Sequence, residues 1–178
     1  YAFTVTETFD WGDAPDSYGT SVLASGANHL IIEGLGLGAN IDAETDGQAV
    51  TAGAPAVGDD DAGTPDDEDS VTFNTPLHRG QDAQLSVSAT NTSGLPATIM
   101  AFIDFNGDGT FDNAEQLPTV TVPDGTSTLT DFDIDFTVPQ NAVAGLTYAR
   151  FRLTTDGVVT PQGAASDGEI EDYELTIT

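Results

Sequence analysis

Apolar and polar residues alternate with a period of two along much of this chain, and this alternation restricts the fold more than any other feature. From Asp131 to Val138 the apolar residues fall on one side of an extended strand and the aspartates on the other. Residues 85–89, 148–154 and 173–177 repeat the alternation. Glycine and proline separate these segments at short intervals. The pattern predicts an all-β fold, an antiparallel β-sandwich.

Two stretches depart from the alternation. Residues 98–105 are apolar at both parities, which is typical of a central strand buried on both faces. The first 70 residues carry little strand signal and many glycine, aspartate and proline residues, and only Ser25 to Leu35 hints at a helix. Because a long loop in a compact domain is usually functional or disordered, the aromatic residues Phe9, Trp11 and Tyr18 favour ordered loops that pack on the sandwich. We therefore expect one domain over residues 1–178, with long calcium-stabilised N-terminal loops and at most one or two short helices.

The charge balance excludes several classes of partner. The chain has 178 residues, with 30 acidic residues against three arginines and no lysine, so its net charge is -27. Nucleic acid and anionic membranes need a basic surface and are poor partners. A salt-adapted or solubilising surface would also be acidic. The chain has no apolar run long enough to enter a membrane as a helix, and no signal peptide is recognisable.

The absence of cysteine excludes disulfides, thiolate chemistry and cysteine-based zinc sites. An extracellular domain without disulfides needs another means of stabilisation, and bound calcium would supply one. We expect a monomeric domain cut from a longer chain, located outside the cell.

Residues 104–115 match the calcium-loop pattern D-x-[DN]-x-[DN]-G-x5-E at every defined position. A hard cation needs six to eight oxygen ligands, and this spacing supplies them from one short segment. Gly109 permits the sharp turn. Three side chains, one carbonyl, one water-mediated carboxylate and one bidentate glutamate would form the cage: Asp104, Asn106, Asp108, Thr110, Asp112 and Glu115. The alternative is an acidic turn without metal.

Further acidic clusters make several calcium ions the expected cofactor. Like charges this close repel one another unless cations are bound. One cluster, at residues 42–47, resembles the opening half of a calcium loop and lacks a closing acid. Solvated turns, or disorder over 52–70, are the alternatives. The candidate ligands outside the 104–115 loop are Asp10, Asp13, Asp16, Asp42, Glu44, Asp46, Asp59, Asp60, Asp61, Asp66, Asp67, Asp69, Glu169, Glu171 and Asp172.

Catalytic patterns are weak, so we expect no enzyme. His29 and His78 are the only histidines, and nothing in the sequence places them together. Glu169 and Glu171 could be taken for the acid and base of a glycosidase, but paired acids in an acid-rich chain carry little information. No Ser-His-Asp arrangement and no phosphate-binding loop is present.

The segments Gly168–Tyr173 and Asp10–Asp16 resemble the GEVED domain of bacterial surface proteins, with isoleucine in place of the valine of the family's motif. Further landmarks extend the resemblance over nearly the whole chain, although Ser70 stands where related sequences more often have glycine. These landmarks are residues 35–46, 58–69, 103–106, 138–145 and 150–152. The chain also resembles the calcium-dependent peptide-binding domains of RTX adhesins.

These resemblances imply a calcium-loaded sandwich on the bacterial cell surface, acting in cell adhesion and biofilm formation. They imply that the domain captures the free C-terminus of a peptide or protein on a host or neighbouring cell. We expect that site within residues 42–69, because long loops on a rigid sandwich carry binding function. A calcium with an open coordination position would accept a carboxylate or vicinal sugar hydroxyls. A calcium-stiffened spacer and a calcium-dependent carbohydrate-binding module are the alternatives.

Overall fold

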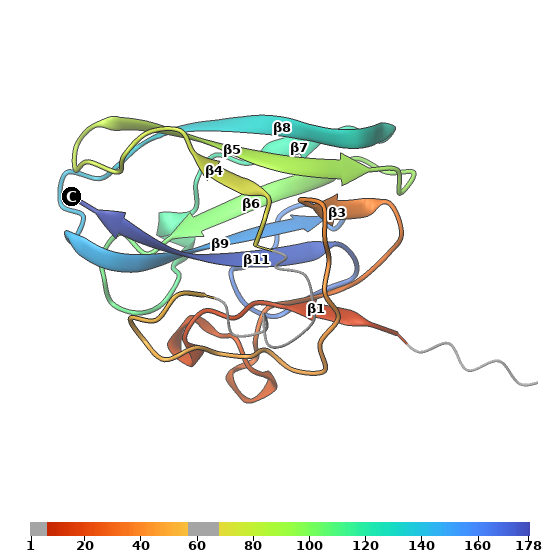
Figure 1. Ribbon diagram of the computed structural model, residues 1–178, viewed down its shortest axis with the longest axis horizontal. Coiled ribbons are helices and arrows are strands. Elements are labelled where there is room, and N and C mark those ends of the chain that lie inside the picture. Colours follow the sequence, from red (N-terminus) through yellow and green to blue (C-terminus); the bar gives the residue numbers. More distant parts are fainter. Residues whose placement is uncertain (1–6, 57–67) are drawn as a thin grey trace, which may run out of the picture.

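Two antiparallel sheets form the body of the protein in a computed structural model that describes residues 7–56 and 68–178 (Figure 1). In the first sheet β5 pairs with β8 on one side and with β3 and β4 on the other, and the second sheet has the order β11-β9-β6-β7. The predicted all-β antiparallel fold is confirmed. The strands of the first sheet are β3 (Leu35–Leu37), β4 (Val71–Phe73), β5 (Asp82–Asn91) and β8 (Thr126–Thr137); those of the second are β6 (Ala97–Ile103), β7 (Val120–Val122), β9 (Gly145–Thr154) and β11 (Glu169–Ile177).

The main hydrophobic core lies between these two sheets. Leu85 and Val87 of β5 and Ile134 of β8 belong to the same buried cluster as Ile99 of β6 and Phe151 of β9. Their spacing by two along each strand explains the alternation in the sequence, since successive side chains point to opposite faces.

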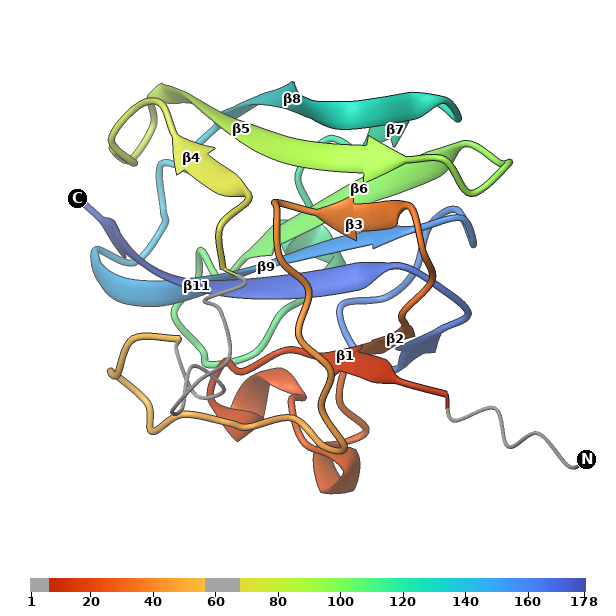
Figure 2. The same cartoon turned by 45° about the vertical axis from the view of Figure 1, so that its right-hand side comes forward.

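A third layer, formed by the N-terminal loops, covers the other face of the second sheet (Figure 2). Its short strands are β1 (Phe9–Trp11), β2 (Asn28–Leu30) and β10 (Ala164–Ala165), and single 3-10 turns lie at Asp16–Tyr18 and Val22–Ala24. A second apolar cluster fills the space between layer and sheet: Ala14, Tyr18, Ala56, Met100, Phe102, Phe111 and Tyr148. Burial on both sides explains why β6 is apolar at both parities.

The prediction of a short helix from Ser25 to Leu35 is wrong. Ser25 has a left-handed backbone (φ 57°) that ends the 3-10 turn Val22–Ala24, and the chain continues as strand β2. β2 pairs antiparallel with β1 and parallel with β10. Strand pairing therefore overrides the weak local preference for a helix. The third 3-10 turn is Asn113–Glu115.

Candidate metal-binding loops and the buried polar layer

The first half of the 104–115 loop wraps short polar side chains around two glycine turns. Oδ1 of Asp104 accepts a hydrogen bond from the Gly107 N–H (2.6 Å), and Oδ2 accepts one from the Gly109 N–H (3.0 Å). Gly107 and Gly109 have φ angles of 70° and 83°, which favour glycine. Asn106 Oδ1 accepts from the Asp108 N–H (2.8 Å). The oxygens therefore gather at one turn, and this donor set fits a hard cation.

Glu115 is engaged differently from the predicted closing ligand. Its Oε1 accepts hydrogen bonds from the N–H groups of Phe105 (2.9 Å) and Asn106 (3.1 Å), and its Oε2 accepts one from Asp112 (3.0 Å). Asp112 and Glu115 form a capping box on the 3-10 turn. Burial raises the pKa of Glu115. In this geometry Glu115 satisfies backbone donors.

Asp104 also connects the loop to its surroundings. The Tyr18 hydroxyl donates to Asp104 Oδ2 (2.7 Å), and the Thr147 hydroxyl donates to the Asp104 carbonyl (2.7 Å). Burial and the Asp104 carboxylate raise the pKa of Tyr18. The remaining candidate ligands of the loop form local bonds: Thr110 donates through its hydroxyl to Asp108 (2.8 Å). The loop is thereby coupled to β9 and to the N-terminal layer.

Glu169, Glu171 and Asp172 of β11 are all fully buried. Glu169 accepts a hydrogen bond from the Leu37 N–H, and Glu171 accepts from the hydroxyls of Ser70 and Tyr173. Asp172 binds Arg150 instead. The first two thus share a face and Asp172 lies on the other, as the alternation predicts.

The N-terminal acids meet β11 across the layer. Asp10 Oδ2 accepts from the Ile170 N–H (2.6 Å), and Glu44 Oε2 accepts from the Trp11 N–H (3.0 Å). Asp13 is fully buried. Burial raises the pKa of Tyr148, and the Asp13 carboxylate contributes to this rise. The sequence segments that carry the family resemblance are therefore joined in space.

The other described candidate ligands accept hydrogen bonds from backbone N–H groups. Asp16 accepts from the Ser21 N–H (2.9 Å), and Asp46 accepts from the Val22 N–H (2.6 Å). Asp42 accepts from the adjacent Ala43 N–H (2.7 Å), and Asp69 accepts from the Ala39 N–H (2.8 Å). Asp59, Asp60, Asp61, Asp66 and Asp67 lie outside the described residues.

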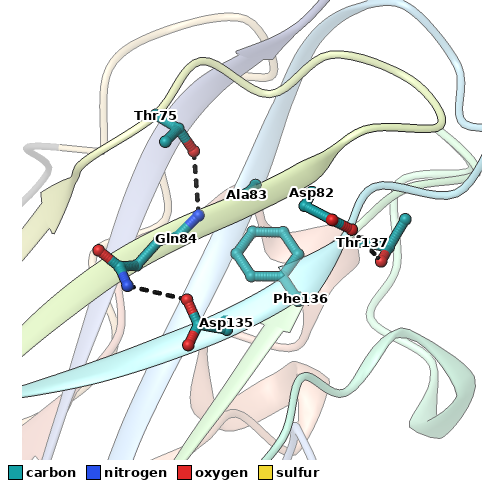
Figure 3. Close-up of a pocket in the computed structure, with 7 residues that line it drawn as sticks. All are labelled: Thr75, Asp82, Ala83, Gln84, Asp135, Phe136 and Thr137. Carbon is teal, nitrogen blue, oxygen red and sulfur yellow. Dashed lines mark hydrogen bonds between the residues drawn. The ribbon is translucent and has the colours of Figure 1, made fainter.

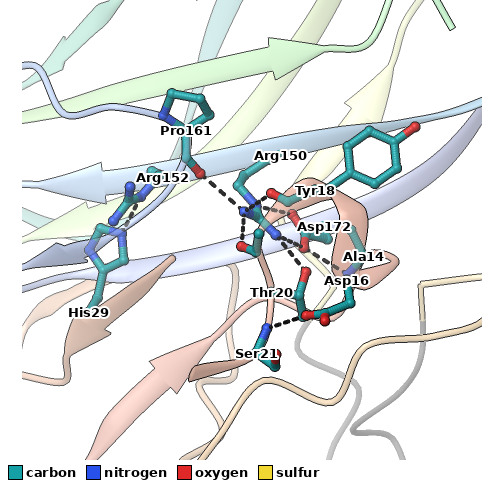
Figure 4. Close-up of polar contacts among 11 residues, drawn as sticks. Ala14, Asp16, Tyr18, Thr20, Ser21, His29, Arg150, Arg152, Pro161 and Asp172 are labelled. Carbon is teal, nitrogen blue, oxygen red and sulfur yellow. Dashed lines mark hydrogen bonds and ion pairs between the residues drawn. The ribbon is translucent and has the colours of Figure 1, made fainter. Parts of the chain in front are cut away.

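A buried arginine, Arg150, holds the layers together (Figure 4). Its Nε and Nη2 donate to the two carboxylate oxygens of Asp172 (2.8 and 2.7 Å). Its Nη1 donates to the carbonyls of Tyr18, Gly19 and Pro161. The guanidinium carbon lies 5.3 Å from the centre of the Phe111 ring. One cation thus satisfies carbonyls from two loops and one carboxylate from β11.

Arg152 forms a second buried centre with His29. Arg152 Nε donates to His29 Nε2 (2.9 Å), which assigns the proton to Nδ1, where it is donated to the Asp167 carbonyl (2.7 Å). Burial, and then Arg152, lower the pKa of His29. Burial and Arg150 lower the pKa of Arg152 to about 9, so Arg152 stays protonated at neutral pH.

Sequence reasoning missed both centres. Alternation places Arg150 and Arg152 on the face opposite Phe151, but an arginine on that face of a sandwich would ordinarily be solvent-exposed. The available signal is that a chain with three arginines spaces two of them by two in a strand.

Within residues 7–56 and 68–178, no three histidine, aspartate or glutamate side chains lie together in a way that could hold a metal ion. Calcium binding therefore stays a prediction. Within the same ranges, no helix has the length and apolar character needed to cross a membrane.

Residues 98–176, from β6 to β11, match the GEVED domain. The resemblance of Gly168–Tyr173 to this family is thereby confirmed. The match begins at residue 98 and does not include residues 10–16, whose resemblance to the family therefore rests on the sequence pattern alone.

The chain is also similar to a solved family 123 glycoside hydrolase from Clostridium perfringens, described in terms of glycolipid glycan hydrolysis. The identity is 12% and the TM-score 0.30, over 57% of this chain and 21% of the hydrolase. This chain therefore spans about a fifth of that enzyme's length, and a likeness this low carries no argument about function. No curated protein matches the sequence.

Proposed function

We propose that this chain is a calcium-dependent ligand-binding module of a bacterial cell-surface adhesin, and that it captures the C-terminal end of a partner peptide through bound calcium. The observation that carries the proposal is the excess of negative charge inside the protein. Among the described residues, seven acidic side chains are buried, against two arginines, and burial and Arg152 lower the pKa of His29 well below its ordinary value. The buried acids are Asp10, Asp13, Asp104, Glu115, Glu169, Glu171 and Asp172.

Hydrogen bonds orient these carboxylates without cancelling their charge. Buried ionised groups are costly unless an opposite charge compensates them, and the alternative is that they bind protons. Arg150 compensates Asp172. Divalent cations with oxygen ligands would add positive charge near the others.

Two sets of residues would hold calcium. Asp104, Asn106 and Asp108 form the turn whose oxygens are gathered after β6. Asp10, Glu44, Glu169 and Glu171 come from segments that meet at β11. When bound, calcium would supply positive charge and, where a coordination position stays open, an anchor for a carboxylate.

We place the ligand-binding part within residues 42–69, whose described portion runs along the N-terminal layer. The described portion is irregular, and Asp42 and Asp46 on it accept hydrogen bonds from the N–H groups of Ala43 and Val22. Binding residues are commonly carried by loops on a rigid scaffold, and the two sheets provide that scaffold. We propose no catalytic activity.

Calorimetry with matched peptides tests this proposal. Peptides with a free C-terminus should bind in calcium, while their C-terminally amidated forms and chelator-treated protein should lose binding. Thermal unfolding with calcium and with excess chelator is measured in parallel, and chelation should lower the melting temperature because a ligand of the folded state stabilises it. Equal binding of both peptide ends would overturn the carboxylate anchor. An unchanged melting curve would overturn the calcium requirement.

A carbohydrate is the second candidate ligand, favoured by a polar cavity of about 420 Å³ between the 104–115 loop and the β9–β10 connection. Thr110, Asp112, Asn113, Thr160 and Gln162 supply its polar side chains. Inhibition of ligand binding by monosaccharides, and not by peptides with a free C-terminus, would favour a carbohydrate ligand. Calcium-dependent stability with no competition by either ligand class would indicate a spacer.

A further inference from the structure

The outer edge of the first sheet is a long strand, β8, that has β5 on its inner side and, among the described residues, no strand paired to its outer side. β8 (Thr126–Thr137) has twelve residues and, in the described part of the chain, pairs only with β5. It runs along the upper rim of the molecule in Figure 1. An edge strand offers its unpaired N–H and C=O groups to any compatible strand.

Three aspartates line the solvent face of this edge. Asp131, Asp133 and Asp135 are exposed and alternate with Phe132 and Ile134, which point to the core. Their spacing of two residues places neighbouring carboxylates about 7 Å apart.

Side chains of β5 hold each aspartate from one side. The hydroxyls of Ser88 and Ser86 donate to Oδ1 of Asp131 and Asp133, and the Gln84 amide donates to Oδ1 of Asp135 (2.8 Å). We call Asp131, Asp133 and Asp135, with these three hydrogen bonds, the aspartate ladder. Each hydrogen bond uses one oxygen of the carboxylate and comes from the β5 side. The carboxylates are thereby ordered before any partner arrives, which lowers the entropy cost of binding.

The ladder ends at a shallow depression of about 410 Å³ (Figure 3). Asp82 and Asp135 supply two carboxylates to its lining, and Thr75, Gln84 and Thr137 supply neutral polar groups. A long cationic side chain fits this combination of volume and charge.

We propose that the free edge of β8 binds an extended segment of a separate protein that carries lysine or arginine at alternate positions. The backbone of the segment would continue the sheet, and its cations would lie opposite Asp131, Asp133 and Asp135. Strand addition of this kind takes its affinity from main-chain hydrogen bonds and its specificity from alternate side chains. Opposite charges on neighbouring strands are favourable, and like charges are not.

Charge complementarity favours a basic partner over a second copy of this chain. In a second copy, aspartates or other acidic residues would lie opposite the aspartates of β8. The chain has three arginines, of which Arg150 and Arg152 are buried, so it cannot supply the basic strand itself. The net charge of -27 would also speed encounter with a basic partner.

The test uses three synthetic peptides with capped ends, so that no terminal carboxylate contributes. One alternates lysine with valine and threonine, one has glutamate in place of each lysine, and one keeps the lysines but has prolines in place of valines. Binding is measured by calorimetry in calcium at about 0.15 M ionic strength, where long-range attraction is screened. Hydrogen exchange of residues 126–137 is measured with and without each peptide.

The alternating lysine peptide should bind and slow amide exchange in β8, and the other two should not. The variant D131N/D133N/D135N should weaken binding by about tenfold or more, as expected when opposite charges are lost from an interface. The control variant E7Q/E33Q/D156N removes the same charge from exposed positions elsewhere and should bind normally.

Equal binding of the lysine peptides with and without proline would reduce the effect to unspecific attraction and overturn the proposal. Absence of binding would also overturn it, as would protection confined to other strands. Self-association through β8 in the absence of peptide would replace the basic partner with a second copy. Because the peptides have capped ends, these outcomes are independent of the carboxylate capture proposed above.

Discussion

Each of the two sheets has a face that points away from the main core; aspartates gather at both of these faces and have opposite roles. At the interface between the second sheet and the N-terminal layer, Asp10 and Asp172 are buried and bind backbone N–H groups and Arg150. On the β5–β8 face, Asp131 and Asp133 stay in water and bind serine hydroxyls. The same side chain is therefore a structural element on one face and a solvated charge on the other. Burial decides between them, since desolvation makes the partner of a buried charge indispensable.

The largest effect should come from removing the cation of the buried face. Arg150→Met leaves Asp172 buried without its partner, and we expect a loss of about 3–5 kcal/mol in the free energy of unfolding. Denaturant unfolding measures it. Arg79→Met is the matched control, because Arg79 is exposed, and it should change stability by less than about 0.5 kcal/mol. Similar losses for the two arginines would contradict the contrast between the faces.

The 104–115 loop should give the next largest effect. Asp104→Ala removes an acceptor from Gly107, Gly109 and Tyr18, and Glu115→Ala removes one from Phe105, Asn106 and Asp112. We expect about 2–3 kcal/mol for each, because hydrogen bonds to charged groups contribute about 1.5–3 kcal/mol.

Calcium dependence separates hydrogen bonding from metal binding in this loop. If Asp104 is a calcium ligand, its substitution should cost more in calcium than in chelator. An identical cost in both would leave the loop as a hydrogen-bonded turn. Glu115→Ala provides the internal comparison, because Glu115 caps backbone donors in this structure.

Part of this structure could be predicted from the sequence. Alternation at 131–138 and 148–154 predicted the strands, and the two-sided apolar character of 98–105 predicted a central one, because a two-residue period follows directly from strand geometry. The facing of Glu169, Glu171 and Asp172 was predicted for the same reason. The helix at 25–35 was wrong because pairing with β1 and β10 is a long-range event without a local signal.

The buried polar layer could not be predicted in the same way. The Arg150–Asp172 pair joins neighbouring strands whose register the sequence does not specify, and the carbonyls of Tyr18 and Pro161 come from loops. The loop pattern predicts calcium ligands at Asp104, Asn106 and Asp108, and in the structure their side chains gather at one turn. It could not show that Glu115 bonds to the backbone of Phe105 and Asn106, because that depends on side-chain rotamers.

A smaller, pH-dependent effect should arise at His29. Burial and Arg152 lower its pKa in the folded protein, while the unfolded chain retains the ordinary value near 6.5. The unfolded state therefore binds more protons below pH 6.5, and stability should fall as the pH falls below that value. The slope from one proton is at most about 1.4 kcal/mol per pH unit.

His29→Gln should flatten this part of the stability profile, measured by denaturant unfolding at fixed calcium concentration. His78→Gln is the control, because His78 is exposed and its ring bonds to the Thr178 hydroxyl. If the pH dependence of stability persists in His29→Gln and disappears in His78→Gln, the assignment of this effect to His29 is contradicted.

The smallest effect should come from the exposed ladder. Asp133→Ala removes a carboxylate that bonds to Ser86 in solvent, and we expect a change of less than about 0.5 kcal/mol in the free energy of unfolding. Replacing all three ladder aspartates by asparagine should be neutral or slightly stabilising, because like charges about 7 Å apart repel one another. Thermal unfolding at low and at high salt checks this, since salt should reduce any gain. A loss as large as that of Arg150→Met would mean that the ladder aspartates are structural, and the difference between the two faces would disappear. A stable triple variant that no longer binds the alternating lysine peptide would instead show that this face keeps its aspartates for a partner.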